Sequence, residues 1–265
     1  MAKNHVRMRS PRLPWARFAM RVGEGLKRVF LEGELTLLGF ERSPPNRVLM
    51  ESCWRRDPVH AYCGRCGRTV LSPGEECRHC RNQRLPHVRV VRLGSYEEPL
   101  SSWVRAVKFS GWEAMGQELG VQLARSFEEA FLDRGDVRTV VVPVPMPRLR
   151  RMVRGIDHAH VLARGFAAAL QLPMRQPMWH GRGFTQATRT AAQRARRKSP
   201  FTPRRFSRSL KGFRVVLVDD VLTSGRTARA AARQIRQLGV KEVVIAVIAV
   251  ADTPLSLDSG ARGNI

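Results

Sequence analysis

The chain has 265 residues, which corresponds to one or two domains at about 150 residues each. Hydrophobic residues make up 43% of the total, so the chain can bury a sizeable core, and this excludes wholesale disorder and a fibrous repeat. Lysine and arginine number 47 against 22 acidic residues, and the net charge of +25 favours polyanionic partners such as nucleic acid, phosphorylated metabolites or anionic lipid.

Residues 1–45 form a basic N-terminal extension. From Trp15 to about Leu38 the apolar residues recur at helical spacing and the basic residues fall elsewhere, which predicts a basic amphipathic helix. Such a helix can pack against the protein or a partner, lie on a membrane surface, or act as an organelle-targeting peptide. Its apolar positions are Trp15, Phe18, Val22, Leu26, Val29 and Phe30.

Four of the five cysteines form two Cys-x-x-Cys pairs. The spacing Cys63-x2-Cys66-x10-Cys77-x2-Cys80 matches a zinc ribbon, in which four thiolates surround the metal and leave no open position. We therefore predict a structural zinc module over residues 50–87, which folds on binding the metal because it has few large apolar residues. Redox dithiols and unligated thiols are the alternatives, and Cys53 is not expected to be a ligand.

The cysteine usage also bears on the compartment. An odd number of cysteines, four of them at metal-ligand spacing, argues against a secreted disulfide framework. The N-terminus lacks the apolar core and cleavage site of a signal peptide. The longest apolar run, residues 243–251, is far shorter than the roughly 20 residues that cross a bilayer. We expect a cytoplasmic protein without a transmembrane helix.

From Val88 onward the pattern changes to alternating strands and helices. Strands that are apolar on both faces and alternate with helices predict a parallel sheet covered on both sides, here an α/β domain over residues 88–252 followed by a tail over 253–265. The expected strands are 88–93, 137–144, 214–218 and 242–250. The expected helices are 99–131, interrupted near Ser110-Gly111, a second one capped by Asp157 and running through Ala169, and a third that follows the loop 219–227 and runs to Leu238.

The loop 219–227 carries the most informative chemistry. A buried strand delivers Asp219 and Asp220 to its carboxyl end, where open α/β sheets bind their ligands. The helix N-terminus that follows suits a phosphate, and Gly225 permits close approach of the backbone. The carboxylates can accept hydrogen bonds from vicinal sugar hydroxyls, so the loop predicts a pocket for a ribose 5-phosphate. The loop's hydroxyl donors are Thr223, Ser224 and Thr227.

Asp219–Thr227 resembles the phosphoribosyl-pyrophosphate (PRPP) signature of type I phosphoribosyltransferases. The chain as a whole is similar to the ComF family, a competence-associated branch that joins a cysteine zinc module to such a domain. The resemblance covers roughly residues 60–252 and rests on blocks that occur in the family's order. These blocks are Cys63–Cys80, Tyr96–Gly111, Val141–Gly155, Thr190–Gln193 and the PRPP loop.

The resemblance implies a role for each part of the pocket. Asp219 and Asp220 would contact the ribose 2′ and 3′ hydroxyls, and the loop Thr223, Ser224, Gly225, Arg226 and Thr227 would hold the 5′-phosphate. The loop after the first core strand, residues 146–154, would hold pyrophosphate, with Arg148, Arg150, Arg151 and Arg154 as candidate contacts. Lys108 would face the same site. Mg²⁺ would bridge pyrophosphate and ribose oxygens, while a nitrogen nucleophile displaces pyrophosphate from ribose C1. Positioning and charge stabilisation would be the protein's main contribution.

The chain departs from the family's pattern in one place near this pocket. The family commonly has Arg-Gly-Phe-Asn-Gln where this chain has Arg154-Gly155-Ile156-Asp157-His158. We expect His158 to be a surface residue at the start of a helix, with a catalytic base as the alternative.

A long basic block contains no acidic residue between His158 and Val218. Arginines interleaved with aromatic residues are typical of single-stranded nucleic-acid binding, but the block can also be a solvated face, or a loop that closes over substrate. The aromatic residues are Trp179, Phe184, Phe201 and Phe206, and a second basic stripe comprises Arg226, Arg229, Arg233 and Arg236.

Three functions follow from these features. The first is a Mg²⁺-dependent phosphoribosyltransferase acting on PRPP and a nitrogenous base. The second is an accessory protein of competence and DNA uptake that keeps the pocket for ligand sensing and binds single-stranded DNA or competence-machinery proteins. The third is a membrane-peripheral adaptor. The zinc module could cover the ligand pocket or touch DNA or a partner.

Overall fold

A computed structural model describes residues 43–70, 77–131, 137–181, 199–204 and 209–251. The predicted N-terminal helix and the C-terminal tail lie outside these residues. The strands are β1 Arg89–Ser95, β2 Thr139–Pro143, β3 Met178–His180, β4 Phe201–Pro203, β5 Arg214–Leu222 and β6 Glu242–Val250. The helices are α2 Pro45–Glu51, the 3₁₀ helix η1 Val59–Ala61, α3 Leu100–Phe109, α4 Glu113–Ala130, α5 Arg148–Arg154, α6 His158–Ala169 and α8 Arg226–Arg236.

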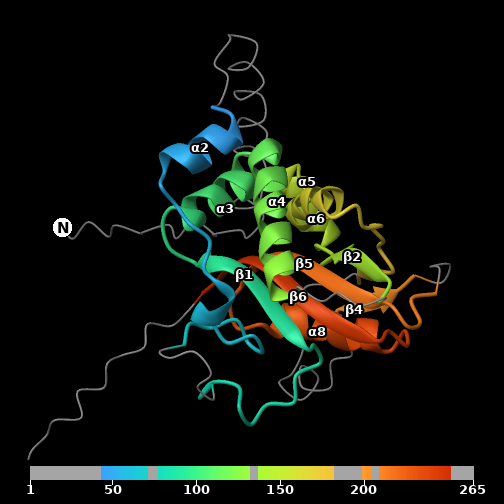
Figure 1. Ribbon diagram of the computed structural model, residues 1–265. Helices are drawn as coiled ribbons and strands as arrows, with labels where there is room; N and C mark the ends of the chain where they lie inside the picture. The colour runs from blue at the N-terminus through green and yellow to red at the C-terminus, as the bar shows by residue number, and fades with distance from the viewer. Residues whose placement is uncertain (1–42, 71–76, 132–136, 182–198, 205–208, 252–265) are drawn as a thin grey trace, which may run out of the picture. The chain divides into compact units, whose positions relative to one another are not determined.

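Four parallel strands form the main sheet in the order β1-β6-β5-β2 (Figure 1). Apart from Arg214, Asp219 and Asp220 of β5 and Glu242 of β6, the two central strands are apolar, and every residue of β6 after Glu242 is buried. Such strands fit only a sheet that is covered on both faces, which confirms the predicted α/β parallel sheet flanked by helices. A separate two-stranded antiparallel sheet pairs β3 with β4.

The alternation of side chains along each strand divides the core into two layers. On one face, Val244, Ala246 and Ile248 of β6 pack with the residues of α3, α4 and α6. On the other face, Val243, Ile245 and Val247 pack with α8 and the β3–β4 hairpin. Figure 1 shows α4 and α6 on one side of the sheet and α8 on the opposite side.

A glycine contact fixes α4 against α6. A Cβ atom at Gly165 would lie 2.0 Å from the backbone oxygen of Gln117, and one at Gly120 would lie 2.2 Å from that of Leu162. Only glycine permits this approach, so the two helix backbones pack directly against each other. The contact sets the position of α6, and therefore of His158, its first residue.

Most predicted elements are confirmed, with one long helix divided at Ser110-Gly111 into α3 and α4 as expected. The limits of β5 were wrong, because hydrogen bonding to β6 continues as far as the pair Leu222↔Val250. Asp219 and Asp220 therefore lie within the strand, and only residues 223–225 form the loop before α8. No helix among the described residues has both the length and the hydropathy that a bilayer crossing requires.

Several elements were not predicted from the sequence: the short helices α2 and η1, the helix α5 and the β3–β4 hairpin. The segment 148–154, expected as a loop, forms the helix α5, which begins after Pro147 and ends at Gly155 with a φ of 70°. A proline that precedes the first turn and a glycine in the left-handed region are ordinary helix limits. The β3–β4 hairpin joins two short segments on either side of residues outside the described ranges.

Candidate active site and metal centre

A cavity of about 200 Å³ lies at the carboxyl end of the sheet. It forms there because β2 stops pairing at Pro143↔Val218, whereas β5 continues beside β6 for four more residues. The chain after β2 turns away from this free edge of β5 and supplies the opposite wall. The lining residues are Lys108, Val144–Pro147, Arg150, Arg154, His158 and the run Asp219–Ala228.

The two aspartates on β5 are held in different ways. The Asp219 carboxylate accepts a hydrogen bond from the backbone N–H of Asp220, at 2.9 Å. For Asp220, Oδ1 accepts from the N–H of Val221 at 2.6 Å, and Oδ2 lies 3.0 Å from Lys108 Nζ and 2.6 Å from His158 Nε2. Asp220 is thus a buried carboxylate with two cationic or hydrogen-bonding side chains on one oxygen.

The different surroundings separate the acidities of the two carboxyl groups. Desolvation by burial, together with the adjacent charge of Asp220, raises the pKa of Asp219 to about 8. Burial also acts to raise the pKa of Asp220, but His158 and Lys108 outweigh it and lower that pKa to about 2. Asp220 is therefore the more acidic member of the pair, and Asp219 is the member that holds a proton more readily.

The loop after β5 leads into the N-terminus of α8. Gly225 has a φ of 69° and is the residue before the helix. The guanidinium of Arg229 donates to the backbone oxygen of Ser224 at 2.5 Å and lies close to Gly225. Thr223, Ser224 and Thr227 are exposed at the cavity. First-turn N–H groups have no partner within the helix, so this end of the cavity offers amide and hydroxyl donors to an anion.

The structure separates the predicted arginines of residues 148–154 into two pairs. Arg150 and Arg154 line the cavity, and the Arg154 guanidinium also lies 5.1 Å from the ring centre of Phe109. Arg148 and Arg151 are exposed and do not line it, and Arg151 lies 4.0 Å from the carboxylate of Asp157. The helical geometry of α5 explains this division. Arg150 and Arg154 are four residues apart and lie on the same face of the helix, so the other two arginines cannot both face the cavity with them.

Helix α5 packs only weakly against the rest of the domain. It buries none of its residues, and Leu149 and Met152 are 57% and 79% exposed. Lys108, in contrast, comes from the buried helix α3 and its side chain is 17% exposed. Apart from Arg226 at the start of α8, the positive groups of the cavity therefore come from one packed helix and one exposed helix.

His158 is the functional candidate that the sequence interpretation placed wrongly. It was expected at the surface, but it is 7% exposed and its Nε2 contacts Asp220 inside the cavity. Asp157 caps α6 by accepting from the N–H of His160, which places His158 as the first helical residue. The capping motif was recognisable in the sequence, but the packing of that first turn against the end of β5 was not.

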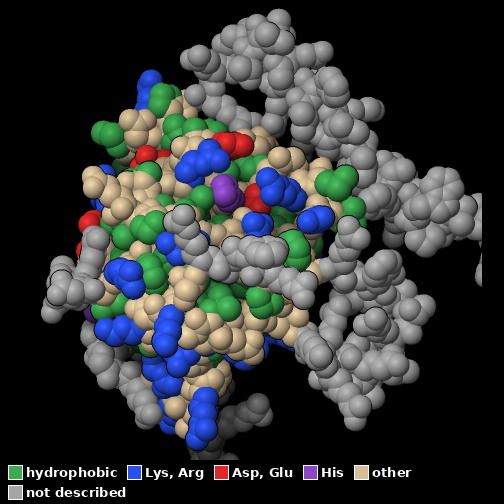
Figure 2. Space-filling view, turned by 90° about the vertical axis from the view of Figure 1, so that its right-hand side faces the viewer, with side chains coloured by type: hydrophobic (Ala, Val, Ile, Leu, Met, Phe, Trp, Pro, Cys, Tyr) green, Lys and Arg blue, Asp and Glu red, His purple; other side chains and the backbone are tan. Residues whose placement is uncertain are grey.

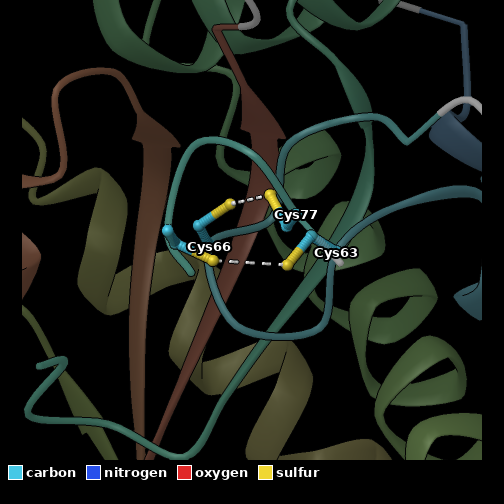
Figure 3. A group of neighbouring side chains, drawn as sticks. Cys63, Cys66 and Cys77 are labelled. Carbon is cyan, nitrogen blue, oxygen red and sulfur yellow. Dashed lines mark hydrogen bonds between the residues drawn. The ribbon is translucent and has the colours of Figure 1, made fainter. Parts of the chain in front are cut away.

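The four predicted metal ligands form one cluster (Figure 3). The sulfur atoms of Cys63, Cys66, Cys77 and Cys80 all lie within 4.8 Å of one another, and the pairs 63–80 and 66–77 are each 3.6 Å apart. Zinc–sulfur bonds of about 2.3 Å place the sulfurs of a tetrahedral shell roughly 3.8 Å apart. The cluster therefore fits a tetrahedral metal ion, while exposed Cys53 lies outside it.

Arg92 of β1 anchors the first cysteine pair to the sheet. This 1%-exposed side chain donates to the backbone oxygen of Gly67 at 2.8 Å and to the carboxylate of Asp57 at 2.7 Å. Its guanidinium also lies 5.1 Å from the ring centre of Tyr62. A Cβ at Gly67, which has a φ of 79°, would lie 2.8 Å from Val90. The cysteine segment is thus closely packed on β1.

The basic block is only partly described. Phe201 is 2% exposed in the core beneath α8 and so offers no exposed ring for stacking on bases, whereas Trp179 is 44% exposed. Phe184, Phe206 and most arginines of the block lie outside the described residues. On α8, Arg226, Arg233 and Arg236 are exposed and Arg229 is half-buried. The opposite face of the helix is buried and includes Ala228, Ala231, Ala232 and Ile235.

Comparison with known proteins identifies the class of this domain. Residues 153–258 match the phosphoribosyl transferase domain family. Among solved structures, the "allosteric regulatory enzyme of purine biosynthesis" is similar over 54% of this chain and 30% of that chain, at 18% identity and a TM-score of 0.38. The sheet and the family match define a phosphoribosyltransferase-like fold.

Curated relatives narrow this class. "Competence protein F" of Haemophilus influenzae is 27% identical over 201 residues, which is 74% of this chain and 88% of the relative. "DNA utilization protein YhgH" of Salmonella typhimurium is 26% identical and covers 70% and 82%, and "Competence protein ComFC" of Bacillus subtilis is 24% identical and covers 71% of each chain. These relatives, named for competence and DNA utilization, support the resemblance of this chain to the ComF family of phosphoribosyltransferase-like proteins.

Proposed function

We propose that the cavity binds PRPP or a related ribose 5-phosphate and that the protein transfers the phosphoribosyl group to or from a nitrogenous base. The observation that carries this proposal is the meeting of three kinds of group in one cavity. An acidic pair lies on β5, anion-binding donors lie at the start of α8, and cationic side chains reach in from α3 and α5. A sugar that bears phosphate at one end and pyrophosphate at the other matches this distribution of charge.

The proposed pose places each part of the ligand against one group of residues. The 5′-phosphate accepts from the residues 223–227, and the ribose hydroxyls donate to the acidic pair. The pyrophosphate lies toward Lys108, Arg150 and Arg154, and Mg²⁺ bound with PRPP would supply further neutralisation of its charge. In the transfer, a base nitrogen forms a bond to ribose C1 as the C1–O bond breaks, and pyrophosphate leaves with the bonding electrons. The enzyme's residues orient the ribose and stabilise the departing anion.

Pyrophosphate release tests the enzymatic proposal directly. The protein is mixed with PRPP, Mg²⁺ and each member of a panel of purine and pyrimidine bases, and pyrophosphate is measured with a coupled enzyme assay. We expect release that requires one of the bases. PRPP binding without release from any base would contradict catalysis and leave a ligand-sensing role.

A second candidate function is favoured by the charge of the surface and by the names of the relatives. Lysine and arginine side chains recur across one face of the molecule, and few acidic side chains appear there (Figure 2). The exposed arginines of α8 and exposed Trp179 supply backbone-binding charge and a ring for stacking. With relatives named for competence and DNA utilization, these features favour an accessory protein of DNA uptake that binds single-stranded DNA.

Salt dependence tests the DNA candidate. Binding of a fluorescent single-stranded oligonucleotide is expected to weaken steeply between about 50 and 200 mM salt, because bound phosphates release condensed counterions. Arg233→Gln combined with Arg236→Gln should flatten this dependence without changing ribose 5-phosphate binding, since neither residue lines the cavity. Affinity that does not change with salt would remove this candidate.

The cysteine cluster completes the proposal as a structural zinc site. Four sulfur ligands would close the tetrahedral shell, so the metal would have no open position for substrate. Its role would be to fold the segment that carries the cysteines and to hold this segment against β1.

A further inference from the structure

Two side chains converge on a single oxygen of Asp220. Lys108 Nζ and His158 Nε2 lie 3.0 Å and 2.6 Å from Oδ2, whereas Oδ1 accepts the backbone N–H of Val221. The three residues come from α3, α6 and β5, so three separate elements meet at one carboxylate. One partner would be enough to compensate the charge, and the presence of two requires a further explanation.

The two partners differ in their freedom to move. Lysine has a long, flexible side chain with three donors, and Lys108 also lines the cavity. His158 is a rigid ring, buried at the first turn of a helix that is capped by Asp157 and pressed against α4 by glycine contacts. Its Nδ1 is buried and has no hydrogen-bond partner among the described residues. Nε2 is therefore the ring atom with a partner: it lies 2.6 Å from Asp220 Oδ2, and this contact orients the imidazole.

We propose that His158 is a positioning residue that holds the Asp220 carboxylate in place for the vicinal diol of ribose, and so leaves Lys108 free to turn to the pyrophosphate of a ligand that has one. This inference rests on the proposed function. His158 then contacts Asp220 rather than the reacting atoms, and its contribution depends on whether the ligand has both hydroxyls. The site should consequently distinguish ribose from 2-deoxyribose through a residue that touches neither sugar.

Comparing two ligands across the wild type and three variants isolates this contribution. Ribose 5-phosphate and 2-deoxyribose 5-phosphate are titrated by calorimetry into the wild type, His158→Leu and His158→Gln. Leucine fills the space without a donor, whereas glutamine restores an N–H donor. His160→Gln is the matched control, because His160 lies on the same helix but does not line the cavity. Thermal unfolding of every variant shows that it is folded.

We expect His158→Leu to weaken ribose 5-phosphate binding about tenfold, as loss of a hydrogen bond to a charged group should. The same variant should leave 2-deoxyribose 5-phosphate binding unchanged, so the preference for ribose is lost. His158→Gln should restore most of the preference, and His160→Gln should not alter it. If His158→Leu instead weakens the binding of both sugar phosphates equally, the substitution disturbs the cavity in general and the positioning role is overturned.

The failure of each proposal gives a different result. If the wild type binds ribose 5-phosphate and prefers it, but His158→Leu keeps the full preference, the inference about His158 is wrong and the proposed function stands. If the wild type binds neither sugar phosphate at concentrations well above those of typical metabolite sites, the proposed function is overturned and the inference with it.

Discussion

Asp220→Asn is expected to weaken the binding of ribose 5-phosphate at least about 100-fold, because the amide cannot accept two charge-assisted hydrogen bonds from the sugar hydroxyls. The substitution also leaves Lys108 and His158 without the carboxylate that they share at 3.0 Å and 2.6 Å. Inorganic pyrophosphate, which lacks a diol, should bind the variant at least as tightly as it binds the wild type. Calorimetric titration with both ligands measures the two effects on one protein preparation.

Two further variants control this result. Glu113→Gln removes an exposed acidic side chain that lies outside the cavity, so it should leave both affinities unchanged. Asp219→Asn should also reduce ribose 5-phosphate binding. Loss of the paired Asp220 carboxylate should lower the stability of the fold, whereas loss of the Asp219 carboxyl group should raise it. Unaltered ribose 5-phosphate affinity in Asp220→Asn would contradict the proposed role of the acidic pair.

The sign of the stability effect follows from the pKa of Asp219. Burial raises this pKa to about 8, so the folded protein binds the proton more tightly than the unfolded chain does. Ionisation therefore opposes folding, and this group's contribution to stability declines as the pH rises from about 4 toward 8. Asp219→Asn removes this decline, so the variant should gain in melting temperature relative to the wild type as the pH rises. Asp220, whose pKa is lowered to about 2, acts only at the acidic end of the range.

Cys66→Ser is expected to abolish stoichiometric zinc binding and to unfold the cysteine segment. Structural zinc provides on the order of 10 kcal/mol of folding free energy in small zinc modules. Among the described residues of 50–87, only Tyr62 and Cys80 are buried hydrophobic side chains. Metal analysis should find one zinc per wild-type chain and far less than one in the variant. Limited proteolysis should then cleave near residues 63–80 in the variant, and in the wild type after chelation.

Cys53→Ser is the matched control for this experiment. Cys53 is exposed and lies outside the sulfur cluster, so the variant should keep its zinc and its protease resistance. A wild-type protein that is folded and free of metal, with the same proteolytic pattern before and after chelation, would show that the cluster has no structural metal.

The sequence was sufficient to predict the elements that repeat a simple physical pattern. β6 was predicted with its exact limits, since Glu242–Val250 is a continuous apolar run with a charged residue at its start. The helix break near Gly111 and the Asp157 cap were equally local signals. The four cysteines were grouped correctly because metal-ligand spacing is itself a local property of the chain.

Features set by contacts between distant residues were harder to predict. The extension of β5 through Asp219 and Asp220 depends on its pairing with β6, which no local pattern of the chain reveals. Arg148 and Arg151 were grouped with Arg150 and Arg154 because the expected loop had no faces, whereas the observed helix has two. His158 was misplaced for the same reason: its burial depends on α6 packing at the end of β5.

Because α5 packs only weakly, the two sides of the cavity differ in their stability against local unfolding. The wall made by β5 is part of a sheet with cores on both faces, and it should open only when the whole domain unfolds. The wall made by α5 buries no residue of its own, so little free energy opposes its local unwinding. Ligand exchange should therefore meet least resistance on the arginine side, with the anionic end of a bound molecule leaving before its sugar.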